Sequence, residues 1–262
     1  MKKTINDVIL ITGGSSGAGF EMAKQYCEMN KTVIICGRSE KKLKKAKEMV
    51  PALHIIQCDV TLKEDRQKIV DTILKEFGRI DMLVNNAGYA DRYMIKDVVN
   101  LEQRTFDEWN TNYMAPLALI KLFLPLLEQS KGKIVNITSG LVYVPLYIEP
   151  NYCATKAALH SYTVSLRFHL KDTGISICEV FYPEIDTPFQ QGHASKMAIT
   201  PDVAAQVAVV GIEKGLEEVR VKRANLLYYL SRLISKRMIK MLNSMVGERV
   251  KQVELNGVYE QN

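Results

Sequence analysis

The 262-residue sequence has no apolar run long enough to cross a membrane. Its longest run, Leu141 to Ile148, is interrupted by Pro145, whereas a membrane-spanning helix needs roughly 18 to 20 apolar residues. Lys2 and Lys3 precede only a short apolar stretch that runs into glycines, so no secretory signal is expected. These absences predict a cytoplasmic protein.

The sequence also lacks the patterns of a metal or disulfide site. Its five cysteines are scattered without a CxxC pair, and its four histidines have no metal-ligand spacing. We therefore expect no bound metal and no disulfide framework, and most of the cysteines should behave as small buried apolar residues.

No linker, fixed-period repeat or low-complexity segment divides the chain. Short Val- and Ile-rich runs alternate with stretches of helical period, which is typical of a parallel sheet wrapped by helices. Strands are predicted near 8–12, 32–36, 53–57, 81–85, 132–138, 175–182 and 218–222. Helices are predicted near 17–29, 39–49, 62–77, 103–129, 152–173 and 200–214. The pattern predicts an α/β, doubly wound Rossmann fold in which helices flank a seven-stranded parallel sheet, with one domain over residues 1–223.

Residues 224–262 are expected to extend that domain as a C-terminal amphipathic helix and tail. The segment from Lys214 to Lys251 holds ten Lys/Arg against three Glu, although the whole chain carries only +6. Two placements of the helix stay open: packing on the core or a neighbouring subunit, and peripheral contact with an anionic membrane. Its expected apolar face consists of Leu226, Leu227, Leu230, Leu233, Ile234, Met238, Met241, Leu242 and Met245.

Glycines cluster directly after the first predicted strand, in Thr12-Gly13-Gly14-Ser15-Ser16-Gly17-Ala18-Gly19. Glycine allows the backbone to turn sharply and approach a ligand closely, and the helix that follows offers unpaired N–H groups to a phosphate. An ordinary flexible turn is the alternative. The position at the first strand-to-helix junction favours nucleotide binding.

The TGxxxGxG spacing resembles the glycine motif of the short-chain dehydrogenase/reductase family. The similarity continues through Asn85-Asn86-Ala87-Gly88 after the fourth strand, Cys58-Asp59-Val60 after the third, and Tyr152-Cys153-Ala154-Thr155-Lys156. Ser139 lies thirteen residues before Tyr152, and Asn112 matches the asparagine of the family's catalytic tetrad. Within the family, the stretch Tyr152–Arg167 and the segment SGLVYVP resemble the DltE-like oxidoreductases.

The resemblance implies an enzyme that moves a hydride between a nicotinamide cofactor and a carbonyl or alcohol. The implied catalytic residues are Asn112, Ser139, Tyr152 and Lys156. The implied cofactor-binding residues are Gly13, Ser15, Ser16, Gly17, Gly19, Arg38, Asp59, Val60, Asn86, Ala87, Gly88, Tyr152, Lys156, Pro183, Ile185 and Thr187. Lys156 would also hold the nicotinamide ribose, and Asn112 would position a water for proton exchange.

The chemistry of Tyr152 and Lys156 agrees with these roles. The two residues are four apart on a predicted helix, so their side chains share one face. A free tyrosine has a pKa of about 10, and an adjacent ammonium group lowers the pKa of a phenol. Tyr152 would exchange a proton with the substrate oxygen, and Ser139 would hydrogen-bond the same oxygen.

The end of the second strand indicates which cofactor is used. An acidic residue there accepts hydrogen bonds from the NAD ribose and repels the extra phosphate of NADP. This chain has Gly37 followed by Arg38, whose guanidinium can pair with a 2′-phosphate, and Ser15 and Ser16 can add hydroxyl contacts. Arg38 as a solvated charge is the alternative. We expect NADP(H) to be favoured over NAD(H), and, because cells generally keep the NADP pool reduced, carbonyl reduction.

One position departs from the family pattern. The family often has Pro-Gly after the sixth strand, whereas this chain has Pro183-Glu184-Ile185-Asp186-Thr187. Glutamate cannot adopt the same backbone angles as readily as glycine, so the loop is expected to depart from the family's path near the nicotinamide contacts around Ile185.

Three segments with no motif are expected to choose the substrate: 89–104, 141–151 and 189–197. Their apolar side chains suit a hydrophobic carbonyl or alcohol, although the loops could also pack on themselves. These side chains are Tyr93, Met94, Val142, Tyr143, Leu146, Tyr147 and Phe189.

The resemblance also implies a homodimer or homotetramer built through helices 103–129 and 152–173. A catalytically silent NADP-binding sensor on the same fold is the alternative function. A nucleic-acid partner is not expected, because the basic tail carries no recognised reading motif.

Overall fold

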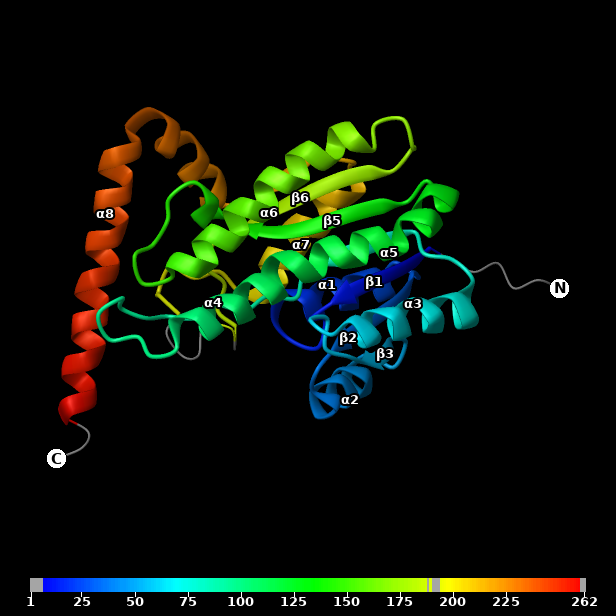
Figure 1. The fold of residues 1–262 in the computed structure, drawn as a ribbon, viewed down its shortest axis with the longest axis horizontal. Helices are drawn as coiled ribbons and strands as arrows, with labels where there is room; N and C mark the ends of the chain where they lie inside the picture. Colours follow the sequence, from blue (N-terminus) through cyan, green and yellow to red (C-terminus); the bar gives the residue numbers. More distant parts are fainter. Residues whose placement is uncertain (1–6, 188, 190–193, 260–262) are drawn as a thin grey trace.

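A computed structural model describes residues 7–187, 189 and 194–259, with side chains to residue 247. Seven parallel strands form one sheet in the order β3-β2-β1-β4-β5-β6-β7 (Figure 1). The order reverses direction between β1 and β4, as in a doubly wound Rossmann fold, which confirms the predicted fold class. The strands are β1 Val8–Thr12, β2 Thr32–Gly37, β3 His54–Gln57, β4 Met82–Asn85, β5 Lys133–Ser139, β6 Ser176–Tyr182 and β7 Glu218–Arg220.

Helices cover both faces of this sheet because successive side chains of each strand point to opposite faces. In β1, Ile9 and Ile11 pack with one group of helices, while Val8 and Leu10 pack with the other. The first face carries α1 Gly17–Glu28, α2 Glu40–Met49 and α7 Pro201–Glu213. The second carries α3 Lys63–Phe77, α5 Ala115–Ser130 and α6 Pro150–His169.

The predicted helix at 103–129 is longer and less regular than expected. It runs as α4 Leu101–Trp109, a π-helical turn η1 Asn110–Met114, and α5. Single π turns inside α-helices are rare and recur at functional sites. Asn112 lies in the middle of this turn and is fully buried.

The C-terminal helix α8, Arg223–Tyr259, is present but does not form one continuous amphipathic face. Ile234 has non-helical angles (φ −137°, ψ 41°), so the helix breaks there and its second part turns back past the end of the sheet (Figure 1). Ala224 and Met238 are buried, while Leu233 is 79% exposed. The break therefore divides the nine apolar residues expected on one face between the protein body and solvent.

Among the described residues, no helix is both long and apolar enough to cross a membrane.

Candidate active site

The glycine loop after β1 is tied to the loop after β4. The Thr12 hydroxyl accepts hydrogen bonds from the backbone N–H of Asn86 (3.0 Å) and of Ala87 (2.9 Å). The Asn86 side chain donates in return to the Thr12 carbonyl at 2.8 Å. The carboxyl ends of two neighbouring strands, on either side of the point where strand order reverses, are therefore held as one surface.

This surface has no room for larger side chains at its glycines. A Cβ on Gly13 would lie 2.9 Å from Ala87 Cα, and one on Gly19 would lie 2.4 Å from Asn86 Nδ2. Gly13 and Gly17 also adopt positive φ angles of 66° and 59°, which glycine accepts without strain. The glycines thus keep the backbone close together and open to an approaching ligand.

The first turn of α1 is suited to an anion. The Ser16 side chain makes no capping hydrogen bond to the helix, and no acidic residue lies in the first turn. The N–H groups and positive dipole end of such a turn attract phosphate. A Cβ on Gly17 would lie 3.1 Å from Thr187 Cγ2, so the predicted nicotinamide-side residue Thr187 reaches the same loop.

Ser15 and Arg38 come from different loops but lie next to the same glycine. A Cβ on Gly37 would lie 3.6 Å from Ser15 Oγ, and Arg38 follows Gly37 with its side chain exposed. The Arg38 carbonyl accepts a hydrogen bond from Gln57 Nε2 at 3.1 Å, which fixes the backbone at this point. A hydroxyl and a guanidinium are therefore available where an acidic residue would exclude a phosphate.

Asp59 and Val60 border the same edge of the sheet after β3. One carboxylate oxygen of Asp59 accepts hydrogen bonds from the N–H (2.9 Å) and hydroxyl (2.7 Å) of Thr61. The Asp59 N–H donates to Asp65 at 2.6 Å, and Val60 is almost fully buried. Asp59 thus shapes the turn into α3 as well as bordering the predicted adenine site.

Lys156, Asn112 and Gly88 converge although they come from α6, the π turn and the loop after β4. A Cβ on Gly88 would lie 3.7 Å from both Lys156 Nζ and Asn112 Oδ1. Lys156 donates to the Ile137 carbonyl at 2.9 Å, and its Nζ lies 5.7 Å from the centroid of the Tyr152 ring.

Both side-chain atoms of Asn112 are already occupied. Its Oδ1 accepts from the Tyr89 N–H at 2.8 Å, and its Nδ2 donates to the Tyr89 carbonyl at 2.7 Å and to Thr155 Oγ1 at 3.1 Å. The side chain therefore fixes the loop after Gly88.

The Ser139 side chain lies near enough to the Tyr152 hydroxyl to affect its pKa. Burial raises the pKa of Tyr152 well above its usual range and Glu149 raises it further, while Ser139 opposes the shift. Burial also lowers the pKa of Lys156 to about 8. The pKa of Tyr152 is therefore raised rather than lowered as expected, and Tyr152 is a protonated phenol at neutral pH.

The unusual loop Pro183–Thr187 is held by its own contacts. Ile185 forms a parallel bridge with Ile199, and the Glu184 carboxylate accepts hydrogen bonds from the N–H (2.8 Å) and hydroxyl of Ser195. Glu184 does not adopt a positive φ, so glutamate replaces the usual glycine here without backbone strain. Its side chain instead ties the loop to the segment before α7.

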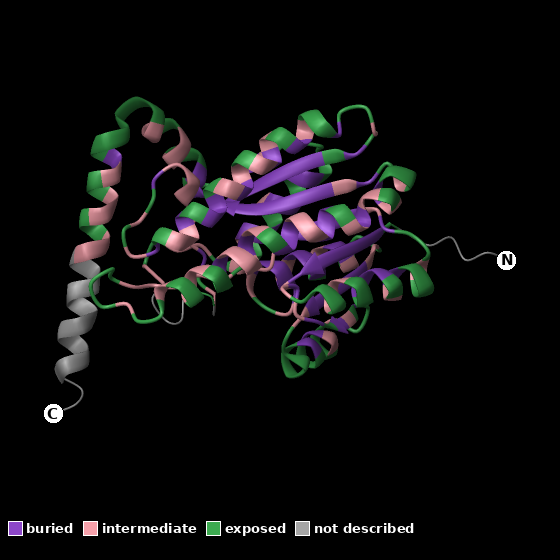
Figure 2. Cartoon of the chain, viewed as in Figure 1, coloured by how far each residue is buried: buried purple, intermediate pink, exposed green. Residues whose placement is uncertain are grey.

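The three loops expected to choose the substrate differ in their roles. Met94, Tyr147 and Phe189 are exposed, and the Phe189 ring lies 5.8 Å from the Tyr152 ring. Tyr143 instead stacks on Phe181 with 5.3 Å between ring centroids, so it belongs to the packing of the protein. Residues 188 and 190–193 lie outside the described residues. Figure 2 shows that the strands are buried, whereas the loops and the first part of α8 beyond the carboxyl ends of the strands are largely exposed or half-buried.

Sequence reasoning missed a set of buried polar residues beneath the site. Asn85 donates to Asn136 at 2.9 Å, and Asn136 donates to Thr163 at 2.9 Å, which links β4, β5 and α6. The sequence could have indicated this network, because it has an asparagine at the end of β4 and another in the middle of β5. Polar residues rarely interrupt buried strands without hydrogen-bond partners.

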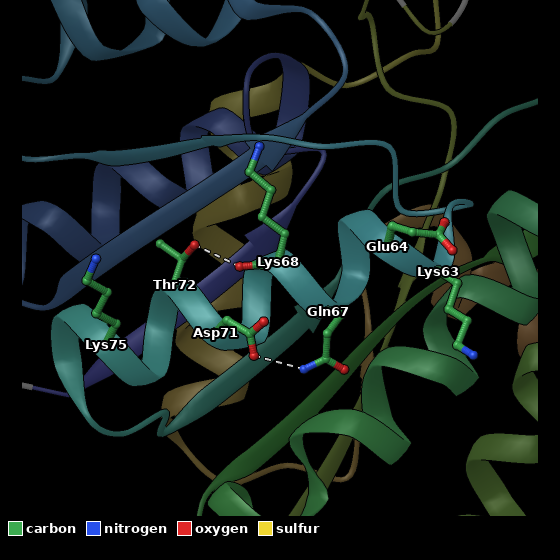
Figure 3. A pocket seen from close by; sticks show the side chains of 7 residues that line it. All are labelled: Lys63, Glu64, Gln67, Lys68, Asp71, Thr72 and Lys75. Carbon is green, nitrogen blue, oxygen red and sulfur yellow. Dashed lines mark hydrogen bonds between the residues drawn. The ribbon is translucent and has the colours of Figure 1, made fainter.

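A shallow groove on α3 is unrelated to this site (Figure 3). Its lining residues all come from one helix, Lys63, Glu64, Gln67, Lys68, Asp71, Thr72 and Lys75. Gln67 donates to Asp71 at 2.9 Å, so the side chains partly satisfy one another. The groove is the solvated face of a surface helix.

Comparison with known proteins agrees with the geometry. Residues 7–198 match the family described as short chain dehydrogenase. The chain belongs to this family. A curated relative, the uncharacterized oxidoreductase DltE of Bacillus subtilis (strain 168), is 38% identical over 248 residues, covering 92% of this chain and 98% of that protein. The predicted similarity to the DltE-like oxidoreductases is thereby confirmed.

A further relative is named as a dehydrogenase. The L-fucose dehydrogenase of Bos taurus is 30% identical over 200 residues, covering 76% of this chain and 73% of that protein. This short-chain dehydrogenase/reductase is therefore an oxidoreductase that acts on CH–OH or C=O groups of a small molecule.

Solved structures show the same fold. A short-chain dehydrogenase/reductase of Burkholderia phymatum in complex with NAD has a TM-score of 0.80 at 17% identity, covering 91% of this chain and 96% of that chain. An alcohol dehydrogenase of Thermococcus sibiricus complexed with 5-hydroxy-NADP has a TM-score of 0.74 at 21% identity, covering 82% and 95%. The fold is one that binds nicotinamide dinucleotides of either kind.

Proposed function

We propose that this enzyme reduces an apolar aldehyde or ketone with NADPH, using Tyr152 as the general acid. The observation that carries the proposal is the convergence of Ser139, Tyr152 and Lys156 beside Gly88, next to a glycine loop that excludes side chains. Bound there, the dinucleotide would supply the hydride.

The chain's own residues would handle the proton and the charge. Tyr152 donates its phenolic proton to the carbonyl oxygen as negative charge develops on it. Ser139 donates a hydrogen bond to the same oxygen, and the Lys156 ammonium stabilises the phenolate that Tyr152 leaves behind. The raised pKa of Tyr152 keeps the phenol protonated, which is the state from which a general acid starts, and the Lys156 ammonium would offset the cost of forming the phenolate.

The glycine loop and its neighbours would hold the cofactor. Gly13, Gly17 and Gly19 let the backbone approach the pyrophosphate at the start of α1, with Ser16 at the helix cap. Asn86, Ala87 and Gly88 would line its middle, Asp59 and Val60 its adenine end, and Pro183, Ile185 and Thr187 its nicotinamide end.

Arg38 and Ser15 are proposed to select NADP(H). Their position around Gly37 offers a guanidinium and a hydroxyl to a 2′-phosphate and no carboxylate to repel it.

The test is a fluorescence titration with NADPH and NADH. The wild type is expected to bind NADPH at least ~10-fold more tightly, since loss of one charge-assisted contact is worth roughly 1.5–3 kcal/mol. Arg38→Asp should remove this preference, whereas Lys45→Asp, the same charge change on the exposed face of α2, should leave it unchanged. Equal affinity for both nucleotides in the wild type would exclude NADP selection.

A carbonyl panel followed at the nicotinamide absorbance tests the reaction. The wild type should turn over a carbonyl of the panel, and Tyr152→Phe should reduce that turnover at least ~100-fold. Tyr229→Phe, on exposed α8, should leave it unchanged. This result would support Tyr152 as the general acid. NADPH binding without turnover of any aliphatic, aromatic or steroidal carbonyl would instead favour the alternative function, a silent NADP sensor.

Peripheral membrane contact through α8 is a separate part of this proposal. Lys236, Arg237 and Lys240 are exposed, as are the apolar residues Met241 and Met245. We expect the protein to float with anionic vesicles and not with neutral ones, and a Lys236→Glu/Lys240→Glu variant to stay in solution. If the wild type and the variant float equally, α8 does not contact the membrane through these lysines, and its role is to pack on the protein.

A further inference from the structure

A glutamate is buried in the middle of the otherwise apolar strand β6. Glu179 is 0% exposed. Its carboxylate accepts a hydrogen bond from Thr138 Oγ1 at 2.7 Å, and its Oε2 lies 2.9 Å from His160 Nδ1. Burying a carboxylate destabilises the fold unless the carboxylate is hydrogen-bonded and faces positive charge. The groups around Glu179 therefore indicate its role.

Glu179 lies beside the proposed catalytic groups. His160 is one helical turn after Lys156 on α6, so both side chains share the face that packs on β5 and β6. Lys156 donates to the carbonyl of Ile137, and Glu179 is bonded to the side chain of the next residue, Thr138. Ser139 follows directly. One short stretch of β5 thus holds the lysine, the glutamate and the catalytic serine.

The other charged groups near Glu179 have their own partners. Glu218, opposite Glu179 in the register of β7, is ion-paired with Arg220. Arg220 also donates to the Tyr143 hydroxyl at 3.2 Å and lies 3.7 Å over the Tyr228 ring. His160 on α6 contacts this carboxylate directly. The Glu179 charge also acts on Lys156 from α6 and on Tyr143 from the segment after β5.

We propose that Glu179 is the buried counter-charge of Lys156, a positioning residue held by Thr138 and His160 that keeps the lysine an ammonium ion within the site. This inference rests on the proposed function, in which that ammonium stabilises the Tyr152 phenolate. Glu179 touches neither substrate nor cofactor and acts through Lys156.

The electrostatics of Lys156 support this role. Burial favours the neutral amine and lowers the pKa of Lys156 to about 8, and the negative charge of Glu179 opposes that shift. Without Glu179 the lysine would lose its proton at a lower pH. Thr138 and His160 matter because they satisfy the carboxylate oxygens and keep the charge in place.

The test compares pH profiles of kcat/KM for carbonyl reduction at saturating NADPH. Glu179→Gln keeps the shape and an acceptor for Thr138 but removes the charge. We expect the alkaline limb of its pH profile to move to lower pH by about 1 unit, because one nearby charge shifts a pKa by about that much. Glu179→Asp retains the charge and should return the limb toward that of the wild type. Glu217→Gln, with a 78% exposed side chain, is the control whose limb stays in place.

A uniform loss of activity in Glu179→Gln, with the alkaline limb unmoved, would overturn the inference and leave Glu179 a structural residue. A wild type that turns over no carbonyl would reject the proposed function instead, so the two failures are distinguishable.

A second measurement needs no turnover. An NMR titration of ¹⁵N-labelled lysine ammonium groups follows the Lys156 resonance in the wild type and in Glu179→Gln. Loss of the Glu179 charge should move the titration of Lys156 to lower pH, because nothing then opposes the effect of burial. A Lys156 titration at the same pH in both proteins would overturn the inference.

Discussion

At the scale of single residues, the proposed cofactor site depends on glycines, because their lack of a side chain lets two loops lie close together. A methyl group at Gly19 would lie 2.4 Å from Asn86 Nδ2 and 3.0 Å from the Gly13 carbonyl. We expect Gly19→Ala to weaken NADPH binding at least ~10-fold, because the glycine loop must move away from the loop after β4. Gly37→Ala meets Ser15 Oγ at an ordinary 3.6 Å and should bind NADH as the wild type does. Unchanged NADPH affinity in Gly19→Ala, measured by fluorescence titration, would contradict the predicted cradle.

Two shifted pKa values predict the pH dependence of reduction. Tyr152 stays protonated throughout the working range because its pKa is raised. Lys156, with its pKa lowered to about 8, is charged below that pH and neutral above it. The rate should therefore fall as pH rises through about 8. Lys156→Arg should be slower but should lose this alkaline limb, because a guanidinium keeps its charge. A limb that persists in Lys156→Arg would assign it to another group.

At the scale of elements, α8 reaches back to the loop between Ser139 and Tyr152, the proposed catalytic serine and tyrosine. The Asn243 side chain accepts from the Tyr147 N–H at 2.7 Å and donates to the Pro145 carbonyl at 3.0 Å. A single side chain thus fixes two backbone groups of a loop expected to choose the substrate.

We expect Asn243→Ala to raise KM for an apolar carbonyl severalfold while the Kd for NADPH stays unchanged, because only the substrate loop is released. Asn225→Ala, on the exposed first part of α8, is the matched control. Steady-state kinetics and nucleotide titration on the two variants separate the effects. A parallel loss of NADPH binding would show that α8 supports the whole site.

At the scale of the whole molecule, exposed aromatic and apolar side chains mark the helices proposed to join subunits. Phe106 on α4, Met114 on the π turn and Phe168 on α6 are exposed, and Phe168 is 73% exposed. Members of this family are commonly oligomeric, and single exposed apolar residues are otherwise unremarkable.

Light scattering after gel filtration should find a dimer or tetramer whose mass falls in Phe168→Asp, since a buried charge at an interface is strongly destabilising. Met49→Asp changes an apolar residue that is 61% exposed on α2, across the sheet, and should leave the mass unchanged. A wild type that is monomeric at micromolar concentration would reject this interface.

The fold class and the identities of the proposed site residues could be predicted before the structure was known. Alternating apolar strands and amphipathic helices have periods of 2 and 3.6 residues, which local sequence records directly. The motifs from Gly13 to Lys156 could be recognised because the backbone and chemistry at those positions require particular residue types.

Only the tertiary structure decided how those residues are arranged and what supports them. Two contacts join segments that are far apart in the sequence, up to 96 residues: the Thr12 bridge between two loops and the Asn243 contact with Tyr147. These contacts and the π turn at Asn112 are not encoded by any local period of the sequence. The kink at Ile234 interrupts a regular apolar pattern, and burial raises the pKa of Tyr152, which the sequence expectation had lowered. Glu179 was visible as an isolated charge in an apolar strand, but its partners became identifiable only when β5, β6 and α6 packed together, because burial and electrostatics depend on neighbours in space rather than in sequence.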